Sequence, residues 1–268
     1  FDLQDGKPHA YCCTHNLAST VSKVDSNTTH LFLVLKDICY FRDSTDIFPN
    51  FTHLENLEAL VLDHDNFYSY SKVHLQRSSF PQPCKLRMFK SQLLLFFTPD
   101  AFGGMNKLEE LTLSNTASTW DIFPGFMNES LCQMKYLKIL DLTQFSDKHS
   151  EIQDEFRPNK VFSGCTIPTL LQLSLRGNNI VKLFSKFYIP FPNLSVLDGS
   201  FNKLLKTDFY LTTGILEAFS IFLMNQLHTA DFGFQMTKIP KREYFAREDL
   251  KLKADIPRPR IKCDRSKN

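Results

Sequence analysis

The sequence lacks several features that would place it in a familiar class at once. No run of eighteen apolar residues occurs among its 268 residues, so no membrane-spanning helix is expected. Its start, FDLQDGKPHA, has neither the basic region nor the apolar region of a signal peptide, so we expect a cytosolic protein or one whose signal has been removed. Basic and acidic residues nearly balance, 31 against 29, which gives no overall charge argument for nucleic acid as a partner.

Sequence motifs for catalysis are missing as well. The sequence contains no G-x-S-x-G, H-E-x-x-H, P-loop or G-x-G-x-x-G, and its eight histidines are scattered. We therefore expect no enzyme, no cofactor and no metal site. The nearest approach to a metal-binding group, His64 between Asp63 and Asp65, is interpreted as solvated. The hydrophobic fraction of 43% is nonetheless enough to bury a core.

Seven cysteines are present, but none belongs to a C-x-x-C pair, which argues against a zinc ribbon or a thioredoxin-like site. Their odd number leaves at least one thiol unpaired within the chain. Acceptor sequences for N-glycosylation, N-x-[ST], favour a secreted protein. Four of them occur, at Asn27, Asn50, Asn128 and Asn193.

A repeated pattern supplies the main structural signal. Residues 170–180 read LLQLSLRGNNI, and this leucine spacing fits neither an amphipathic helix nor plain strand alternation. The template L-x-x-L-x-L-x-x-N-x-L recurs in degenerate copies, with a weak ninth copy near Leu250. Its second leucine position falls at residues 31, 60, 86, 111, 140, 173, 197 and 230. The steps of 24 to 33 residues lie at or slightly above those of leucine-rich repeats.

The template predicts a short strand followed by a sharp turn. Leucines two residues apart point to one face of a strand, and stacked copies make a parallel sheet with a continuous core. The asparagine, present as Asn178 and Asn202, is expected to hydrogen-bond the backbone of its own turn and of the neighbouring repeat. Apolar residues three apart predict helical or 3₁₀-like return segments at 99–111 and 131–140. Phenylalanines of the return segments are expected to form a buried aromatic spine: Phe48, Phe51, Phe102, Phe126, Phe162 and Phe191.

These features together resemble the ectodomain of a Toll-like receptor, over roughly residues 11–257. The likeness rests on SNTTHLFLVLKDI at 26–38, AFGGMNKLEELTLS at 101–114 and RGNNI at 176–180. It implies an α/β repeat solenoid: a leucine-rich-repeat horseshoe arc with a parallel concave sheet. The expected parts are an N-terminal cap at 1–27, eight or nine repeats at 28–257, and a tail or the start of a further repeat at 258–268.

The sequence departs from the family at its C-terminal end. The usual cysteine cluster of a C-terminal cap is missing, since only Cys263 lies there, and no membrane span or signalling domain is found. We therefore expect a fragment or a soluble form. The resemblance implies an innate immune receptor that binds a microbial ligand and a second receptor chain, as a homo- or heterodimer. Such an ectodomain lies outside the cell or in the endosomal lumen and meets the membrane only through parts absent from this sequence.

Two other classes share the repeat. A secreted or cell-surface adhesion or matrix protein with leucine-rich repeats is the alternative function. A cytosolic binder of the ribonuclease-inhibitor type is a third possibility, disfavoured by the four glycosylation acceptors and the sparse cysteines.

The outward-facing strand positions are the expected binding surface. In the third repeat they bring together a basic and aromatic group that suits a phosphate or a carboxylate: Lys85, Arg87, Phe89 and Lys90. The plain alternative is a set of ordinary solvated residues with acidic neighbours in adjacent repeats. Two longer segments, 146–160 and 207–222, interrupt the repeats and are either further binding elements or ordinary loops.

Two disulfides are expected. Cys12 or Cys13 should bond within the N-terminal cap, with Cys39 as the partner. Cys132 and Cys165 each lie eight residues before the second leucine of their repeats, which places them at similar heights in neighbouring coils. The alternative for this second pair is two buried thiols.

Overall fold

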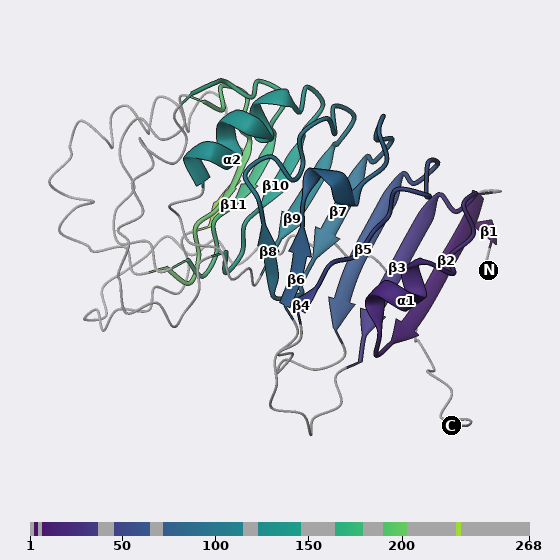
Figure 1. Cartoon of the computed structure of the whole chain (residues 1–268). Coiled ribbons are helices and arrows are strands. Elements are labelled where there is room, and N and C mark those ends of the chain that lie inside the picture. The colour runs from purple at the N-terminus through teal and green to yellow at the C-terminus, as the bar shows by residue number, and fades with distance from the viewer. Residues whose placement is uncertain are drawn as a thin grey trace, which may run out of the picture. The chain divides into compact units, whose positions relative to one another are not determined.

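Strands stacked side by side make up the described part of the molecule. The computed structural model describes residues 3–4, 7–36, 46–64, 72–114, 123–145, 164–178, 190–202 and 229–231. All of them lie within a single unit, Phe1–Lys238. There the chain winds as a parallel β-solenoid, and ten strands form one sheet in which successive coils lie next to each other (Figure 1).

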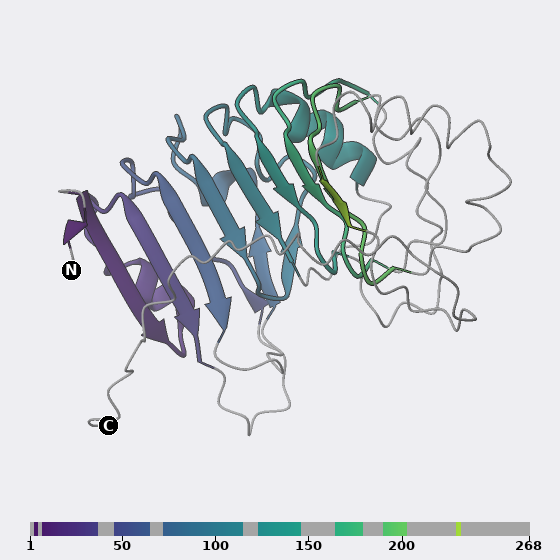
Figure 2. The same ribbon diagram turned by 180° about the vertical axis from the view of Figure 1, so that it is seen from behind.

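The large sheet follows the order of the chain. Strand β1 (Leu3–Gln4) runs antiparallel to β2 (Lys7–Thr14), and every later pair of neighbours is parallel (Figure 2). The remaining strands are β3 (His30–Leu35), β5 (Ala59–His64), β7 (Met88–Ser91), β9 (Glu110–Leu113), β10 (Ile139–Asp141), β11 (Gln172–Ser174), β12 (Val196–Asp198) and β13 (Thr229–Asp231). Strand β2 falls within the predicted N-terminal cap and adds a strand before the first predicted repeat.

A second, three-stranded parallel sheet forms on the return side of the coils, from β4 (Asp46–Ile47), β6 (Lys72–Leu75) and β8 (Leu95–Phe97). Helix within the described ranges is limited to α1 (Leu17–Val21), α2 (Phe123–Glu129) and the 3₁₀ turns η1 (Arg77–Ser79) and η3 (Leu131–Gln133). The repeat solenoid and its parallel sheet are confirmed, but the α/β class is corrected to a β-solenoid with little helix. Three returns pass through extended segments whose alternate residues face the core.

The register confirms seven of the eight predicted repeat positions, with Leu31, Leu60, Leu111, Leu140, Leu173, Leu197 and Ala230 in one row across the sheet. In the third repeat the prediction was wrong. There Phe89, and not Leu86, stands opposite Leu60 and Leu111. Both Leu86 and Phe89 are fully buried, as the first and second apolar positions of the template. Because phenylalanine replaces the second leucine, matching leucines alone places this strand three residues too early.

Phenylalanine fills the space between the two sheets. Phe102 meets Phe89, Phe97 and Phe126 edge-on, with ring centroids 5.2 to 5.8 Å apart, a favoured geometry for aromatic pairs. Four members of the predicted spine are fully buried: Phe51, Phe102, Phe126 and Phe191. The prediction is wrong for Phe48, whose side chain is 58% exposed, and Phe162 lies outside the described residues.

Asn178 and Asn202 are buried in the turns that follow β11 and β12. The Asn178 side chain accepts a hydrogen bond from the N–H of Phe145 (2.7 Å) and donates one to the carbonyl of Leu142 (2.7 Å), both in the preceding coil. Asn202 likewise donates to Leu175 O (2.9 Å) and accepts from Asn178 N (3.0 Å). The predicted role is confirmed, since each amide satisfies backbone groups that two adjacent coils leave open.

The return segment before β9 is 3₁₀-like, as predicted. Its hydrogen bonds span three residues, from Ala101 N to Thr98 O, from Met105 N to Phe102 O and from Leu108 N to Met105 O. This winding drops one fully buried apolar side chain into the core per turn. The predicted segment at 131–140 begins with η3 and follows the same pattern, from Met134 N to Leu131 O and from Leu137 N to Met134 O.

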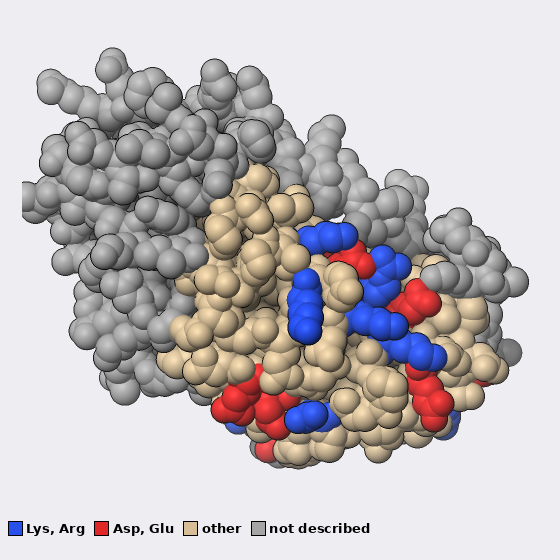
Figure 3. Space-filling view, turned by 90° about the horizontal axis from the view of Figure 1, so that it is seen from above, with Lys and Arg blue, Asp and Glu red and all other residues tan. Residues whose placement is uncertain are grey.

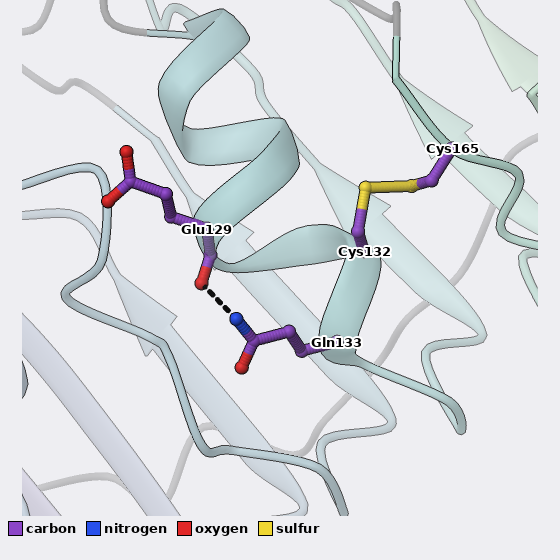
Figure 4. Close-up of a disulfide and its surroundings, with 4 residues drawn as sticks. All are labelled: Glu129, Cys132, Gln133 and Cys165. Atoms are coloured by element: carbon purple, nitrogen blue, oxygen red, sulfur yellow. Dashed lines mark hydrogen bonds between the residues drawn. A yellow bond between two sulfur atoms is a disulfide. The ribbon is translucent and has the colours of Figure 1, made fainter.

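A disulfide joins Cys132 and Cys165, as predicted, with a Cα–Cα distance of 5.8 Å. Cys132 lies in η3 just after α2, and Cys165 lies on the segment that leads toward β11 (Figure 4). Strands β10 and β11 pair in register, so residues at equal offsets before them meet at one height in the stack. Next to the bridge, Gln133 Nε2 donates to Glu129 O (2.8 Å) and holds the end of α2 against the turn.

Replacing Asn178 by alanine should lower the free energy of unfolding by about 2–4 kcal/mol, because buried hydrogen bonds to two coils are lost together. Urea unfolding followed by circular dichroism measures this. Asn106→Ala is the matched control, since Asn106 is exposed and its loss should cost less than about 0.5 kcal/mol. Equal losses of unfolding free energy in the two variants would show that the buried Asn178 amide contributes no more to stability than an exposed asparagine does.

Replacing both Cys132 and Cys165 by serine should destabilise the protein by about 3–4 kcal/mol, because the bridge closes a 33-residue loop in the unfolded chain. The wild type in reductant should fall to the stability of the double variant. Alkylation of both cysteines under denaturing conditions without reductant would contradict the bridge.

Candidate functional site

The residues that precede the strands form a regular row along one end of the solenoid. The N–H groups of Glu58, Arg87, Glu109 and Lys138 each donate to the carbonyl of the equivalent residue one coil earlier, at 2.7–2.8 Å. This backbone ladder places four side chains of alternating sign in sequence along the edge. We call the four residues the charge ladder. Figure 3 looks down on the end from which the strands start, where basic and acidic side chains are interleaved.

Ion pairs link neighbouring members of the charge ladder. Glu109 accepts from Arg87 Nε through one carboxylate oxygen (2.7 Å) and from Lys138 Nζ through the other (2.7 Å). These hydrogen bonds, from Lys138 first and then Arg87, lower the pKa of the Glu109 carboxyl, and the bond to Glu109 raises the pKa of the Arg87 guanidinium. Beside them, Lys90 Nζ lies 2.6 Å from Glu110. Glu109 is therefore the carboxylate that holds two cations together.

In the predicted anion-binding group of the third repeat, the surface position expected for Phe89 is wrong. Phe89 is fully buried in the core and cannot stack on a ligand. Its three basic companions remain at the surface, but each already has an acceptor: Lys85 bonds Asn56 Oδ1 (2.9 Å), Arg87 bonds Glu109, and Lys90 pairs with Glu110. Arg87 and Lys90 are charge-compensated by carboxylates of the neighbouring coil, whereas the acceptor of Lys85 is a neutral amide.

A shallow hollow of about 310 Å³ lies at the charge ladder. Its apolar lining comes from Ala59 on β5, Met88 on β7 and Ile139 on β10. Around these stand all four ladder residues, together with His30 and Glu110. Carboxylates and cations thus alternate over an apolar patch, an arrangement suited to a ligand that carries both charge signs rather than to a simple anion.

The outward face of the large sheet changes character along its length. On β2 and β3, His9 stacks on His30 with ring centroids 4.3 Å apart, and Tyr11 stacks on Phe32 at 4.7 Å. Farther along, the last outward positions of β10, β11 and β12 are polar, namely Asp141, Ser174 and Asp198, and the first are Ile139, Gln172 and Val196. The part of the face on β2 and β3 offers aromatic contacts, and the part on β10 to β12 offers hydroxyl and carboxylate groups beside aliphatic side chains.

The glycosylation acceptors are accessible, because the side chains of Asn27, Asn50, Asn128 and Asn193 are all exposed. In the predicted cap, Cys12 is a half-buried thiol whose pKa is raised by burial, and Cys13 is exposed. The partner expected for one of them, Cys39, lies outside the described residues, as do 146–160, 207–222 and 258–268.

Sequence reasoning missed Glu58, Glu109 and Lys138 as members of a site. A signal for them existed: each lies two residues before the second apolar position of its repeat, and Arg87 lies two before Phe89. Because the sequence analysis placed the second apolar position of the third repeat at Leu86 instead of Phe89, Arg87 was not aligned with Glu58, Glu109 and Lys138. The alternation of charge along the row was therefore not recognised.

No protein-family model matches the chain, and no curated protein matches it. In the part of the chain that the structure describes, no helix has the length and apolar character to cross a membrane. Across the same ranges, no three histidine, cysteine or acidic side chains gather as metal ligands would.

Replacing Glu109 by glutamine should strengthen binding of polyanions, because Arg87 and Lys138 lose the carboxylate that joins them. The salt concentration that elutes the protein from immobilised heparin measures this, and it should rise. Glu129→Gln makes the same change in net charge at an exposed site on α2 and is the matched control. Equal shifts in the two variants would mean that net charge, and not the ladder, decides retention.

Proposed function

We propose that the chain is a ligand-binding segment of an extracellular leucine-rich-repeat receptor of the Toll-like type. In this proposal it binds a microbial ligand and a second receptor chain. The observation that carries it is the pair of buried turn asparagines: Asn178 and Asn202 each join two coils through backbone groups, in the position the leucine-rich template reserves for asparagine. A parallel sheet of L-x-L strands and 3₁₀-like returns support the same family.

The extracellular or lumenal placement is supported by covalent chemistry. Disulfides persist in oxidising compartments and are rare where thiols are kept reduced. The Cys132–Cys165 bridge therefore favours a secreted or lumenal chain. The exposure of all four N-glycosylation acceptors agrees with this, because an acceptor must remain solvated to carry a sugar.

The ligand contact is proposed at the hollow beside the charge ladder. Its side chains are positioned by backbone hydrogen bonds and ion pairs, so little conformational entropy would be lost on binding. A ligand with acidic and basic groups can exchange partners with Arg87, Glu109 and Lys138 without leaving a charge unpaired.

One observation favours the alternative of an adhesion or matrix protein. The cations that an anionic microbial ligand would need are each held by an acceptor of the protein itself. Such a compensated surface suits a protein partner. The two proposals separate in binding assays, in which the secreted chain is immobilised and offered bacterial lipid, bacterial protein, nucleic acid and collagen. Saturable binding of a microbial ligand, weakened by Arg87→Glu, supports the receptor; binding of collagen alone supports adhesion.

Sugar should be present on at least two of the four acceptor asparagines when the chain is produced in secreting animal cells. Intact-mass analysis before and after treatment with a glycosidase measures this directly. An unchanged mass would remove the extracellular proposal, for the receptor and the adhesion protein alike.

A further inference from the structure

Two stretches of the chain share the order Phe-Pro-Asn-x-Ser/Thr: FPNFT at 48–52 and FPNLS at 191–195. The fold treats their phenylalanines in opposite ways, since Phe191 is fully buried and Phe48 is 58% exposed. We propose that Asn50 carries an N-linked glycan whose first sugar stacks on the exposed ring of Phe48. The Phe48 ring, at the edge of the second sheet, would then bind the chain's own glycan.

Phe48 and Asn50 share one exposed face of an extended segment. From Asp46 to Thr52 the even-numbered residues are exposed, and the odd-numbered residues between them are buried or half-buried. Phe48 precedes a proline, which holds it in an extended conformation. Residues two apart in extended chain lie on the same side, roughly 6–7 Å from each other. A sugar attached to Asn50 therefore begins next to the Phe48 ring.

The ring of Phe48 is held in place by its neighbours. It stacks on His74 of β6 with centroids 4.7 Å apart, and His74 stacks on Phe96 of β8 at 5.1 Å. Lys72 Nζ lies 5.7 Å from the Phe96 ring, and Asp46 Oδ1 lies 3.2 Å from His74 Nε2. Among the described strands β4 is at the edge of this sheet, so no described strand of the sheet lies beyond Phe48. One ring face is stacked on His74, and the 58% exposure of Phe48 leaves ring surface available to a sugar.

An open aromatic face of this kind suits a sugar. The C–H groups on one side of a pyranose carry partial positive charge, and the face of an aromatic ring is negative. Stacking would also remove from water an exposed phenylalanine that the fold leaves uncovered.

The amide of Asn50 is oriented for the attachment. Its Oδ1 accepts hydrogen bonds from Thr52 N (2.9 Å) and Thr52 Oγ1 (2.6 Å), and within the described residues Nδ2 makes none. In the modification, Nδ2 forms a bond to C1 of the first N-acetylglucosamine of a lipid-pyrophosphate-linked oligosaccharide. The bond from C1 to the pyrophosphate oxygen breaks, the lipid pyrophosphate leaves, and one amide proton is released. Oδ1 keeps both of its donors.

Asn193 provides the contrast within the same chain. Its Nδ2 donates to Pro168 O (2.8 Å), and the phenylalanine two residues before it belongs to the core. A glycan at Asn193 would have no exposed ring of Phe191 to stack on, although the local sequence is nearly the same.

The proposal rests on the extracellular placement proposed above, and the test separates the two. The chain is secreted from animal cells, and mass spectrometry of its peptides measures the occupancy of each acceptor; we expect Asn50 to be occupied. Thermal unfolding is then compared for the wild type, Phe48→Ala, Asn50→Gln and the double variant. Phe48→Ala should lower the midpoint by about 2–4 °C in the glycosylated chain and by much less in the Asn50→Gln background.

Three further forms make the result specific. Trimming the glycans to their first sugar should keep the effect of Phe48→Ala, because the contact is with that sugar. Thr52→Ala, which removes the acceptor sequence and keeps the asparagine, should behave as Asn50→Gln does. In an Asn193→Gln background the effect of Phe48→Ala should remain unchanged.

Three outcomes would overturn the proposal, and they are distinguishable. If Asn50 is empty while other acceptors carry sugar, the contact between the glycan and Phe48 is rejected. Additive effects of Phe48→Ala and Asn50→Gln reject it as well. Neither result contradicts the extracellular placement. Absence of sugar from all four acceptors rejects both the contact and the placement.

Discussion

Stacking of coils, each with apolar side chains that it cannot bury alone, is the interaction on which the rest of this structure depends. A single strand with two inward leucines has nothing to pack against, so each coil is stable only between its neighbours. The row that runs from Leu31 to Leu197 and the buried phenylalanines behind it supply this packing. The turn amides of Asn178 and Asn202 then satisfy backbone groups between coils, and the Cys132–Cys165 bridge joins two consecutive returns.

The same stacking creates the surface chemistry. Once the coils are in register, residues some twenty to thirty positions apart become neighbours, and charges at one offset fall into a row. Glu109 lies between Arg87 and Lys138 for this reason alone. Exposed ion pairs of this kind add little to stability, because solvent screens them. Their consequence lies in recognition: they decide which cations a ligand can reach and which it must share with a carboxylate.

The position within the coil also decides whether similar local sequences are buried or exposed. The two Phe-Pro-Asn stretches have nearly equal intrinsic preferences, yet one phenylalanine enters the core and the other lies at the edge of the second sheet. The difference arises from how far each stretch lies from its strand: Phe191 is six residues before Leu197, at a position that winds into the core, whereas Phe48 is twelve before Leu60. The exposure of each phenylalanine is therefore decided by its position in the coil and not by the Phe-Pro-Asn sequence.

The sequence by itself determined the repeat, the parallel sheet and seven of the eight strand positions. It also determined the role of the two turn asparagines and the Cys132–Cys165 pair. Each of these follows from the spacing of residues within one coil or at equal offsets in two coils. Only the tertiary structure decided what depends on the register between coils and on shape. Phenylalanine at position 89 fills a leucine position because the core there is built of aromatic rings, which no leucine count reveals. The return strands, the exposure of Phe48 and the pairing of Arg87 with Glu109 depend on which residues of different coils meet, and a one-dimensional pattern does not contain that information.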